Sequence, residues 1–266
     1  GVGLVADLKN EPSHKIIEMG ITVLKRLMHR GAVGSDPDTG DGAGILLALP
    51  DEFFRLVLPN KLPARGKYGV AMMFGGCGHE EELEAAVTEN GGSVIAWRQV
   101  PVDRDSIGKN AQRTCPLIRQ LFIDGSGFAD QAEFERKLFV MRREMERRVE
   151  GCYVCSCSSR SIVYKGLFLG TQIEGFYGDL ASEHFKSPLA LVHQRYSTNT
   201  FPTWSLAHPF RYLAHNGEIN TLRGNLNHLS VREPHLSSTL LGDDLQKLLP
   251  LIPPGQSDSA CLDNMV

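Results

Sequence analysis

Short runs of apolar residues, separated by turn residues, predict a series of β-strands along the chain. Each run has the length, and most have the flanking glycine, proline, asparagine or aspartate, that are typical of a buried strand. The runs span residues 1–6, 45–49, 67–74, 93–100, 114–123, 153–158, 161–164, 189–196 and 211–214. We interpret residues 153–158 and 161–164 as a strand pair.

Apolar residues spaced three or four positions apart predict amphipathic helices between these strands. The spacing is clear in residues 13–28, where Ser13 is the expected N-cap and Gly31 stops the helix. A long amphipathic helix is expected over residues 130–149. Shorter helices are expected at residues 79–89, 217–229 and 243–249.

The predicted strands and helices do not alternate as regular βαβ units, which favours an α+β layered sandwich over a doubly wound parallel sheet. No internal repeat or linker is visible, so we expect one domain over residues 1–266. The sequence begins with Gly1 rather than Met, and its last residues carry no stop signal. We therefore expect it to be a fragment of a longer multidomain chain.

The composition is that of an ordinary folded protein. Of the 266 residues, 42% are hydrophobic and 22% are charged. The net charge of −3 does not indicate a protein that binds nucleic acid through a basic surface. No apolar run reaches the roughly 18 residues of a membrane helix, and no secretory signal is visible. The densest basic cluster, Arg142, Arg143, Arg147 and Arg148, is interleaved with glutamates, which indicates a solvated helix face.

The six cysteines lack the spacing of a disulfide framework, so we expect a reducing, cytoplasmic location. Cys152, Cys155 and Cys157 form one cluster, and a C-x2-C pair is part of many zinc sites. No second pair lies at a suitable distance, so we interpret these residues as thiols in or beside a strand and expect no metal. The segment 35–44, SDPDTGDGAG, lacks the glutamate of a calcium loop and the Gly-Lys of a phosphate loop. We expect a tight loop whose backbone passes close to a site.

Two motifs carry the candidate chemistry, HQRYST from residue 193 and HNGEIN from residue 215. Arg195 ends a predicted strand beside two hydroxyl residues, and its guanidinium can bind a carboxylate with two hydrogen bonds. Asn216 and Gly217 suit an oxyanion hole, because a side-chain amide and the next backbone N–H can both point at one developing negative charge. Asp258, in a predicted loop, can pair with a substrate ammonium.

These groups favour acyl transfer on a small carboxylate-bearing substrate, a reaction that needs a nucleophile. Cys77, Cys115 and Cys261 are weak candidates, since none stands in a Cys-His context or beside an activator in the sequence. The printed sequence therefore offers no evident nucleophile.

Five segments together resemble the glutaminase domain of the glutamate synthase large subunit, a member of the class II, N-terminal-nucleophile glutamine amidotransferases. They read GVGLVADL, HRGAVGSDPDTGDGAGILLALP, SSRSIVYKGL, HQRYSTNTFPTWSLAHPFRYLAHNGEINTLRGN and GQSDSACLDN, and together they run along nearly the whole chain. The long FPTWSLAHPFR connection is similar to glutamate synthase rather than to the phosphoribosyl or sugar-phosphate amidotransferases.

The resemblance implies a four-layer αββα sandwich of the N-terminal-nucleophile hydrolase type, with a catalytic cysteine as the first residue of the mature chain. In this family the thiol attacks the glutamine amide with the chain's own α-amine as base, ammonia leaves, and water hydrolyses the γ-glutamyl thioester. The family pattern is Cys followed by Gly-Val-Gly, so the expected nucleophile lies directly before Gly1, and the sequence as printed would not complete the reaction. Arg30 resembles a residue that orients the N-terminus.

The other site residues carry over by their motifs. Arg195 matches the residue that grips the glutamine α-carboxylate, and Thr198 matches a neighbouring substrate contact. Asn216 and Gly217 match the oxyanion hole, and Asp258 matches the acid that binds the α-ammonium. The implied substrate is L-glutamine.

In the whole enzyme, the resemblance implies that ammonia passes through a tunnel to a synthase domain of the same chain. There it combines with 2-oxoglutarate, and the imine is reduced to a second glutamate. That half uses FMN and an iron–sulfur cluster, with NAD(P)H or ferredoxin as electron donor and a reductase small subunit or ferredoxin as partner. We expect no cofactor in this domain. Two alternatives stay open: a glutaminase domain of another amidotransferase, and a non-catalytic glutamine-binding module.

Overall fold

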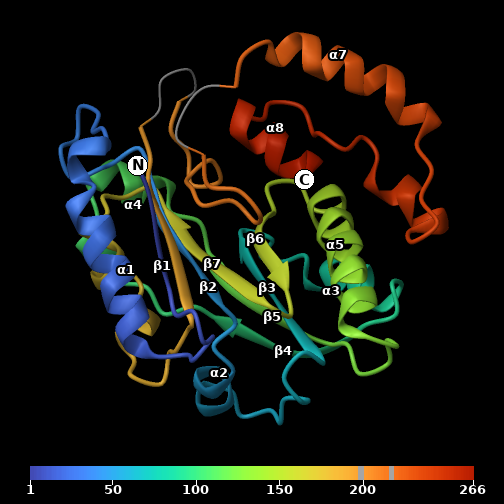
Figure 1. The fold of residues 1–266 in the computed structure, drawn as a ribbon, viewed down its shortest axis with the longest axis horizontal. Coiled ribbons are helices and arrows are strands. Elements are labelled where there is room, and N and C mark those ends of the chain that lie inside the picture. Colours follow the sequence, from blue (N-terminus) through green and yellow to red (C-terminus); the bar gives the residue numbers. More distant parts are fainter. Residues whose placement is uncertain (197–200, 216–218) are drawn as a thin grey trace.

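Two four-stranded antiparallel sheets lie face to face at the centre of the molecule (Figure 1). The computed structural model describes residues 1–196, 201–215 and 219–266. The first sheet has the order β1 (Val2–Ala6), β8 (Leu189–Gln194), β2 (Ala43–Ala48) and β7 (Ser161–Gly166). The second has the order β4 (Ser93–Gln99), β5 (Ile118–Asp124), β3 (Tyr68–Phe74) and β6 (Tyr153–Ser158).

Helices cover the outer face of each sheet, which completes four layers (Figure 1). Helix α1 (His14–Arg26) lies on the first sheet, and Gly20 allows close approach, because a Cβ there would lie 2.6 Å from the Cβ of Ala190. Helices α3 (Glu80–Thr88) and α5 (Gln131–Arg148) lie on the second sheet. The predicted α+β fold, an αββα sandwich, is confirmed.

Strand β3 shows how the alternation of side chains builds two cores. Val70, Met72 and Phe74 face the first sheet and join the core between the sheets. Ala71 and Met73 face the other way and pack with α3 and α5. Successive side chains of a strand point to opposite faces, so a strand that is apolar on both faces must be covered on both.

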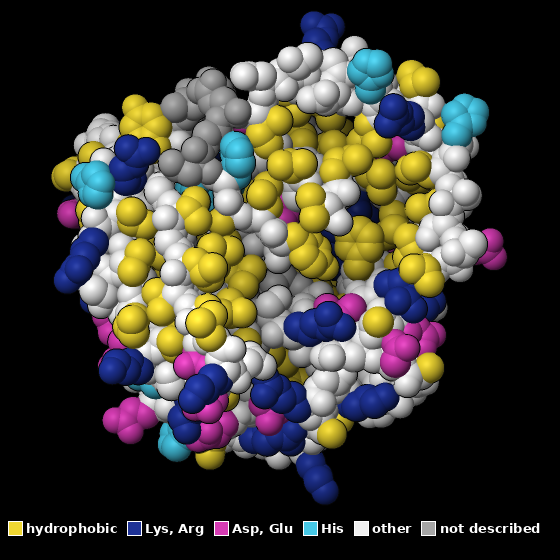
Figure 2. Space-filling model, in the orientation of Figure 1, with side chains coloured by type: hydrophobic (Ala, Val, Ile, Leu, Met, Phe, Trp, Pro, Cys, Tyr) yellow, Lys and Arg dark blue, Asp and Glu magenta, His cyan; other side chains and the backbone are white. Residues whose placement is uncertain are grey.

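The remaining helices lie between and around the layers. They are η1 (Met28–Arg30), α2 (Asp51–Val57), η2 (Arg104–Ser106), α4 (Lys109–Thr114), α6 (Ile173–Phe176), η3 (Gly178–Ala181), α7 (Leu222–Arg232), η4 (Glu233–His235), η5 (Gly242–Leu248) and α8 (Asp258–Met265). Figure 2 shows hydrophobic side chains gathered around a hollow beneath α7. A pocket of about 260 Å³ lies there, between α7 and the segment 250–256.

Most predicted elements are present, with small shifts at their ends. The long helix α5 begins after Asp130, whose side chain accepts a hydrogen bond from the Glu133 N–H at 2.7 Å, as an N-cap should. The helix predicted at residues 217–229 is α7, which begins at Leu222, while residues 217 and 218 lie outside the described part of the chain. The helix predicted at 243–249 is the 3-10 helix η5.

Three local predictions are wrong. Strands β6 and β7 do not pair, because each joins a different sheet and the turn between them crosses the sandwich. Residues 211–214 form no strand, since their hydrogen bonds go elsewhere: Tyr212 N–H donates to Asp263 Oδ1 at 2.9 Å, and Phe210 N–H donates to the Leu213 carbonyl at 2.8 Å. Asp258 is not in a loop but is the first residue of α8.

The interpretation of the arginine cluster on α5 as a solvated face is wrong for half of its members. Arg142 is only 2% exposed and Arg143 only 8% exposed. Arg143 donates to the carbonyl of Pro250, after η5, at 2.5 Å, and Arg142 donates to Asn264 Oδ1 of α8 at 3.5 Å. Charge interleaved at helical spacing cannot reveal this, because the covering segments come from much later in the sequence.

Cys152, Cys155 and Cys157 are buried thiols in or beside β6, as interpreted from the sequence. Burial raises the pKa of each of these thiols. Within the described ranges there is no group of three or more His, Cys, Asp or Glu side chains that could hold a metal ion. Nor do those ranges contain a helix long and apolar enough to cross a membrane.

Candidate active site

The candidate site lies where β1 begins and β8 ends. The Gly1 nitrogen donates to the Gln194 carbonyl at 2.5 Å, and the Gln194 N–H donates back to the Gly1 carbonyl at 2.8 Å. On the other side of β8, the Arg195 N–H donates to the Gly42 carbonyl at 2.8 Å. The end of β8 is therefore held between the first residue of the chain and the loop that leads into β2.

Arg195 is the charged centre of this region. Its side chain is only 6% exposed, and its Nη1 donates to the carbonyl oxygen of Asp41 at 3.3 Å. Burial lowers the pKa of Arg195, and the carboxylates of Asp41 and Asp258 act in the opposite direction. A buried guanidinium beside two carboxylates matches the cation that the sequence predicted, and it adds Asp41, which the sequence did not single out.

Asp258 lies close enough to influence Arg195, although it comes from the far end of the chain. As the first residue of α8 it follows Ser257, whose side chain caps the helix by accepting from the Ala260 N–H. Asp258 Oδ2 accepts from the Ile219 N–H at 2.8 Å. The helix thus fixes the carboxylate next to the HNGEIN segment as well as near the arginine.

Thr198, Asn216 and Gly217, which the sequence predicted as site residues, lie outside the described residues. His215 and Ile219, which lie on either side of residues 216–218, are described. His215 accepts at its carbonyl from His193 Nε2 at 3.0 Å, and the Ile219 N–H donates to Asp258 Oδ2 at 2.8 Å.

Arg30 packs directly against the first residue. A Cβ on Gly1 would lie 3.0 Å from the Arg30 Cβ and 3.2 Å from its Cγ. The Arg30 side chain is otherwise exposed, at the end of η1. Its role in orienting the N-terminus stays a prediction.

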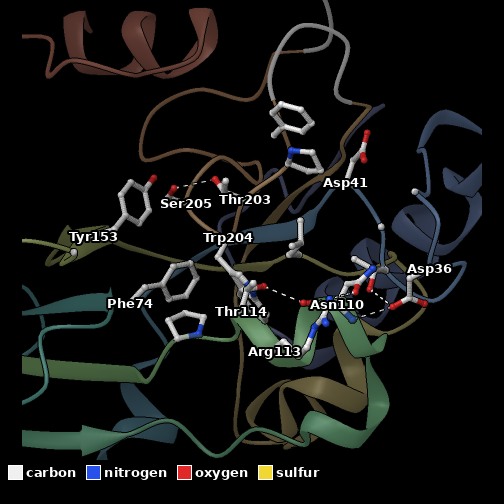
Figure 3. Close-up of a pocket in the computed structure, with 18 of the residues that line it drawn as sticks. Asp36, Asp41, Phe74, Asn110, Arg113, Thr114, Tyr153, Thr203, Trp204 and Ser205 are labelled. Atoms are coloured by element: carbon white, nitrogen blue, oxygen red, sulfur yellow. Dashed lines mark hydrogen bonds between the residues drawn. The ribbon is translucent and has the colours of Figure 1, made fainter.

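A pocket of about 840 Å³ opens beside Asp41 (Figure 3). Figure 3 shows Phe74 and Tyr153 on one side of it, Asp36 and Asn110 on the other, and Trp204 between them. Asp36 accepts from the Asn110 N–H at 3.0 Å, which ties the loop 35–44 to α4. The loop predicted from its glycines and aspartates thus forms one wall of the pocket.

Two of the candidate thiols, Cys115 and Cys261, are poorly suited to attack. Burial raises the pKa of Cys115 and of Cys261, which keeps both protonated at neutral pH. The carboxylate of Asp258 raises the pKa of Cys261 further. The low weight given to them from the sequence agrees with these environments.

Sequence reasoning missed three residues that hold the site: Gln194, His193 and His208. Gln194 is fully buried, and its Oε1 accepts from the Gly170 N–H at 2.8 Å. His193 and His208 stack on each other. His193 and Gln194 lie in an apolar strand and His208 lies in a connection, and none of them carries a periodic signal, so only the fold reveals these contacts.

Comparison with known proteins gives one consistent result. Residues 1–266 match the family model of class-II glutamine amidotransferases. The chain is 49% identical to the glutamate synthase [NADPH] large chain of Bacillus subtilis and 42% identical to that of Azospirillum brasilense, covering 99% and 100% of this chain. It is 40% identical to a chloroplastic ferredoxin-dependent glutamate synthase of Oryza sativa over 99% of its length. It spans only 18%, 18% and 17% of these relatives.

Proposed function

The chain belongs to the class-II glutamine amidotransferases, and on that premise we propose that it hydrolyses L-glutamine to glutamate and ammonia through a γ-glutamyl thioester. One observation carries the proposal. The start of β1, the buried guanidinium of Arg195 and the carboxylate of Asp258 meet at one end of the first sheet, although they come from three distant parts of the chain.

The nucleophile in this proposal is a cysteine directly before Gly1. In the antiparallel register of β1 and β8, Val2 lies opposite His193 and Gly1 pairs with Gln194. One further step of that register brings the preceding residue opposite Arg195. A thiol there would meet a substrate held by Arg195, and the free α-amine of the same residue would take the thiol proton.

The substrate is held by its α-amino acid end. Arg195 binds the α-carboxylate through two parallel hydrogen bonds, a geometry that guanidinium groups favour. Asp258 binds the α-ammonium, and Thr198 adds a further contact. This arrangement leaves the side-chain amide of glutamine directed toward the nucleophile, while Arg30 keeps the chain start in place.

Thiol attack turns the amide carbonyl oxygen into an oxyanion, which Asn216 Nδ2 and the Gly217 N–H stabilise. The protonated α-amine returns its proton to the amide nitrogen, so that collapse of this intermediate expels ammonia and leaves the thioester. Water then attacks the thioester and forms a second tetrahedral oxyanion, which the same donors stabilise. Collapse of that intermediate releases glutamate and the free thiol. Every step uses amino-acid groups and water, so the proposed hydrolysis requires no cofactor.

In the longer protein, we propose that the ammonia serves glutamate synthesis from 2-oxoglutarate. The names of the relatives and their much greater length support this role, and they also support a synthase domain in the same chain. FMN and an iron–sulfur cluster would belong to that part, with NAD(P)H or ferredoxin as electron donor and a reductase subunit or ferredoxin as partner. A cytoplasmic location is part of the same proposal and agrees with six free cysteines.

The proposal is tested by measuring ammonia and glutamate released from glutamine by the full-length protein. Equal amounts of both products are expected. Asn216→Ala should lower turnover by about 10²–10³-fold with little change in KM, since it removes one oxyanion donor. Asn227→Ala, on an exposed part of α7, is the matched control and should have no effect. Glutamine binding without any release of ammonia would contradict the proposal and favour a binding module.

A further inference from the structure

A small cavity lies where α5 and β6 meet the segment that follows Phe210. Its volume is about 10 Å³, and its lining includes Arg142 of α5, Ser156 of β6, and Arg211. None of its lining residues belongs to the candidate active site. The two arginines are only 2% and 8% exposed, so buried positive charge forms part of the cavity wall.

The guanidinium groups of these two arginines reach the same acceptor. Arg142 Nη1 donates to Asn264 Oδ1 of α8 at 3.5 Å, and Arg211 Nη2 donates to the same oxygen at 3.3 Å. Burial, and then the positive charge of Arg211, lower the pKa of Arg142 to about 10. Two like charges held side by side away from water repel each other, so this place favours a negative charge.

The carboxylates that act on Arg142 do not balance the arginines around it. The charged groups that act on it are Arg143, Arg211, Glu146 and Asp263. An oxygen of Glu146 lies 3.0 Å from Arg142 Nη1, and its other oxygen lies 3.8 Å from Arg211 Nη1. Asp263 Oδ2 lies 3.0 Å from Arg211 Nη2. Three positive charges therefore share two negative charges, and a buried charge without a partner is costly.

A further carboxylate, Glu135, is bound by neutral groups instead. It accepts from the Ser158 hydroxyl at 2.9 Å, and from the N–H and the hydroxyl of Ser159, both at 2.6 Å. Ser158 also lines the cavity. Because its oxygens face these hydroxyl and amide donors, Glu135 does not take the place of a third partner for the arginines.

Three side chains that line the cavity keep a hydrogen-bond donor without an acceptor. The Nε atoms of Arg142 and Arg211 are enclosed and have no partner among the described residues. The Ser156 hydroxyl accepts from the Val163 N–H at 3.1 Å, and within those same residues its own hydrogen reaches no acceptor. Guanidinium N–H groups can only donate, so a guest that satisfies them must accept.

We propose that this cavity binds a monovalent anion of about the size of chloride, held by the Nε–H groups of Arg142 and Arg211 and by the Ser156 hydroxyl. The space is that of about one water-sized guest, which excludes phosphate, sulfate and carboxylate ligands. One negative charge balances the surplus of the three arginines. The anion stabilises the junction of α5, β6 and α8, and this role does not depend on glutamine hydrolysis.

Bromide identifies the guest directly, because its anomalous scattering distinguishes it from water. Crystals of the full-length protein are grown in sodium bromide and measured at the bromine absorption edge. An anomalous peak within hydrogen-bond distance of the Nε atoms of Arg142 and Arg211 is expected. A cavity that holds only water under these conditions would overturn the inference.

Hydrogen exchange measures the effect of the anion on the native protein. Chloride replaces gluconate at constant ionic strength, and gluconate is too large for the cavity. Above the dissociation constant, each tenfold rise in chloride should slow amide exchange in α5 and α8 by up to about tenfold. Helix α1, on the other sheet, is the internal control and should not respond. Equal responses of α1 and α8 would contradict a specific site.

Two variants connect this effect to the cavity. Arg142→Met removes the surplus charge together with one donor, and it should abolish the chloride response. The matched control is Arg147→Met on the same helix, whose side chain is 56% exposed and which should respond as wild type does. A chloride response that persists unchanged in Arg142→Met would show that the anion binds elsewhere.

Ser156→Ala serves if Arg142→Met does not fold, because it removes one hydroxyl and little volume. Loss of one hydrogen bond to a charged guest should raise the chloride concentration at half-maximal effect by about 10–100-fold. An unchanged half-maximal concentration would exclude the Ser156 hydroxyl as a ligand and overturn the inference as stated.

Discussion

At the scale of single residues, the site depends on charges that are buried but compensated. Arg195 lies near the carboxylates of Asp41 and Asp258. It donates to the Asp41 carbonyl oxygen, and Asp258 accepts a hydrogen bond from the Ile219 N–H. The sequence identified Arg195 and Asp258 by motif, because their residue types suit an amino-acid substrate. It could not identify Asp41, whose backbone carbonyl and carboxylate both act on Arg195, or His193, which contacts a backbone carbonyl, because these contacts follow no recognisable sequence pattern.

Replacement of Arg195 by lysine tests the carboxylate clamp. The lysine ammonium keeps the charge but cannot donate two parallel hydrogen bonds. We expect Arg195→Lys to lower kcat/KM for glutamine by about 10–100-fold, mainly through KM, because hydrogen bonds to charged groups contribute about 1.5–3 kcal/mol. Steady-state kinetics measures this, with the exposed Arg232→Lys as control. An unchanged KM would remove Arg195 from glutamine binding.

Stability in acid tests the neutral state of His193. Burial lowers its pKa from 6.5 to about 3 in the folded protein. Between these values the unfolded chain binds a proton that the folded chain does not, so the free energy of unfolding falls as pH falls. His193→Gln should lack this contribution, which reaches at most about 1.4 kcal/mol per pH unit. Urea unfolding of both proteins at about pH 5 and about pH 7 measures it, and identical pH dependence in the two proteins would contradict a neutral His193.

At the scale of elements, the sequence predicted those helices and strands whose structure depends mainly on their own residues. Strand β3 and helix α5 carry strong apolar periods, and both were predicted to within a few residues. Prediction failed where the structure or burial of a segment depends on contacts with distant parts of the chain. Residues 211–214 give their hydrogen bonds to Asp263 and to a turn, and the arginines of α5 are covered by a later segment. Helix α8 was missed because its eight residues carry little apolar periodicity of their own.

The close contact between β2 and the His208 connection gives a prediction at this scale. A Cβ on Gly44 would lie 2.5 Å from the His208 carbonyl oxygen and 2.6 Å from the Lys165 Cβ. We expect Gly44→Ala to destabilise the protein by about 1–3 kcal/mol through overpacking. Chemical unfolding measures this effect.

Gly127→Ala is the matched control, because a Cβ at Gly127 would meet no atom within 4 Å. Its stability should stay close to that of wild type. A Gly44→Ala protein that also behaves as wild type would show that β2 and the His208 connection can separate without consequence.

At the scale of the whole molecule, a buried polar network joins the two sheets. Arg98 of β4 donates to both oxygens of Asp179 at 2.8 and 2.7 Å, and Tyr164 of β7 donates to the same carboxylate at 2.9 Å. Gln120 of β5 donates to the Tyr164 hydroxyl at 2.9 Å. The sandwich is therefore fixed in register by directional contacts as well as by its apolar core. Such contacts across two sheets could not be derived from the sequence.

Removal of the shared carboxylate should be costly. Asp179→Ala leaves Arg98 buried without its partner, and we expect a loss of about 3–5 kcal/mol in the free energy of unfolding. The control is Glu174→Ala, which breaks an ion pair with Lys25 whose side chains are 42% and 43% exposed. That change should cost less than about 1 kcal/mol. A similar decrease in the free energy of unfolding in both variants would mean that the buried network contributes no more to stability than an exposed ion pair.

The account's central claim is that a thiol directly before Gly1 attacks glutamine held by Arg195 and Asp258. Mass spectrometry of the N-terminal peptide of the native protein tests it most directly, before and after treatment with a diazo-ketone analogue of glutamine. The account predicts a cysteine ahead of Gly1 that carries the analogue after treatment. A native protein that begins at Gly1, or a label found only on another residue, would contradict it.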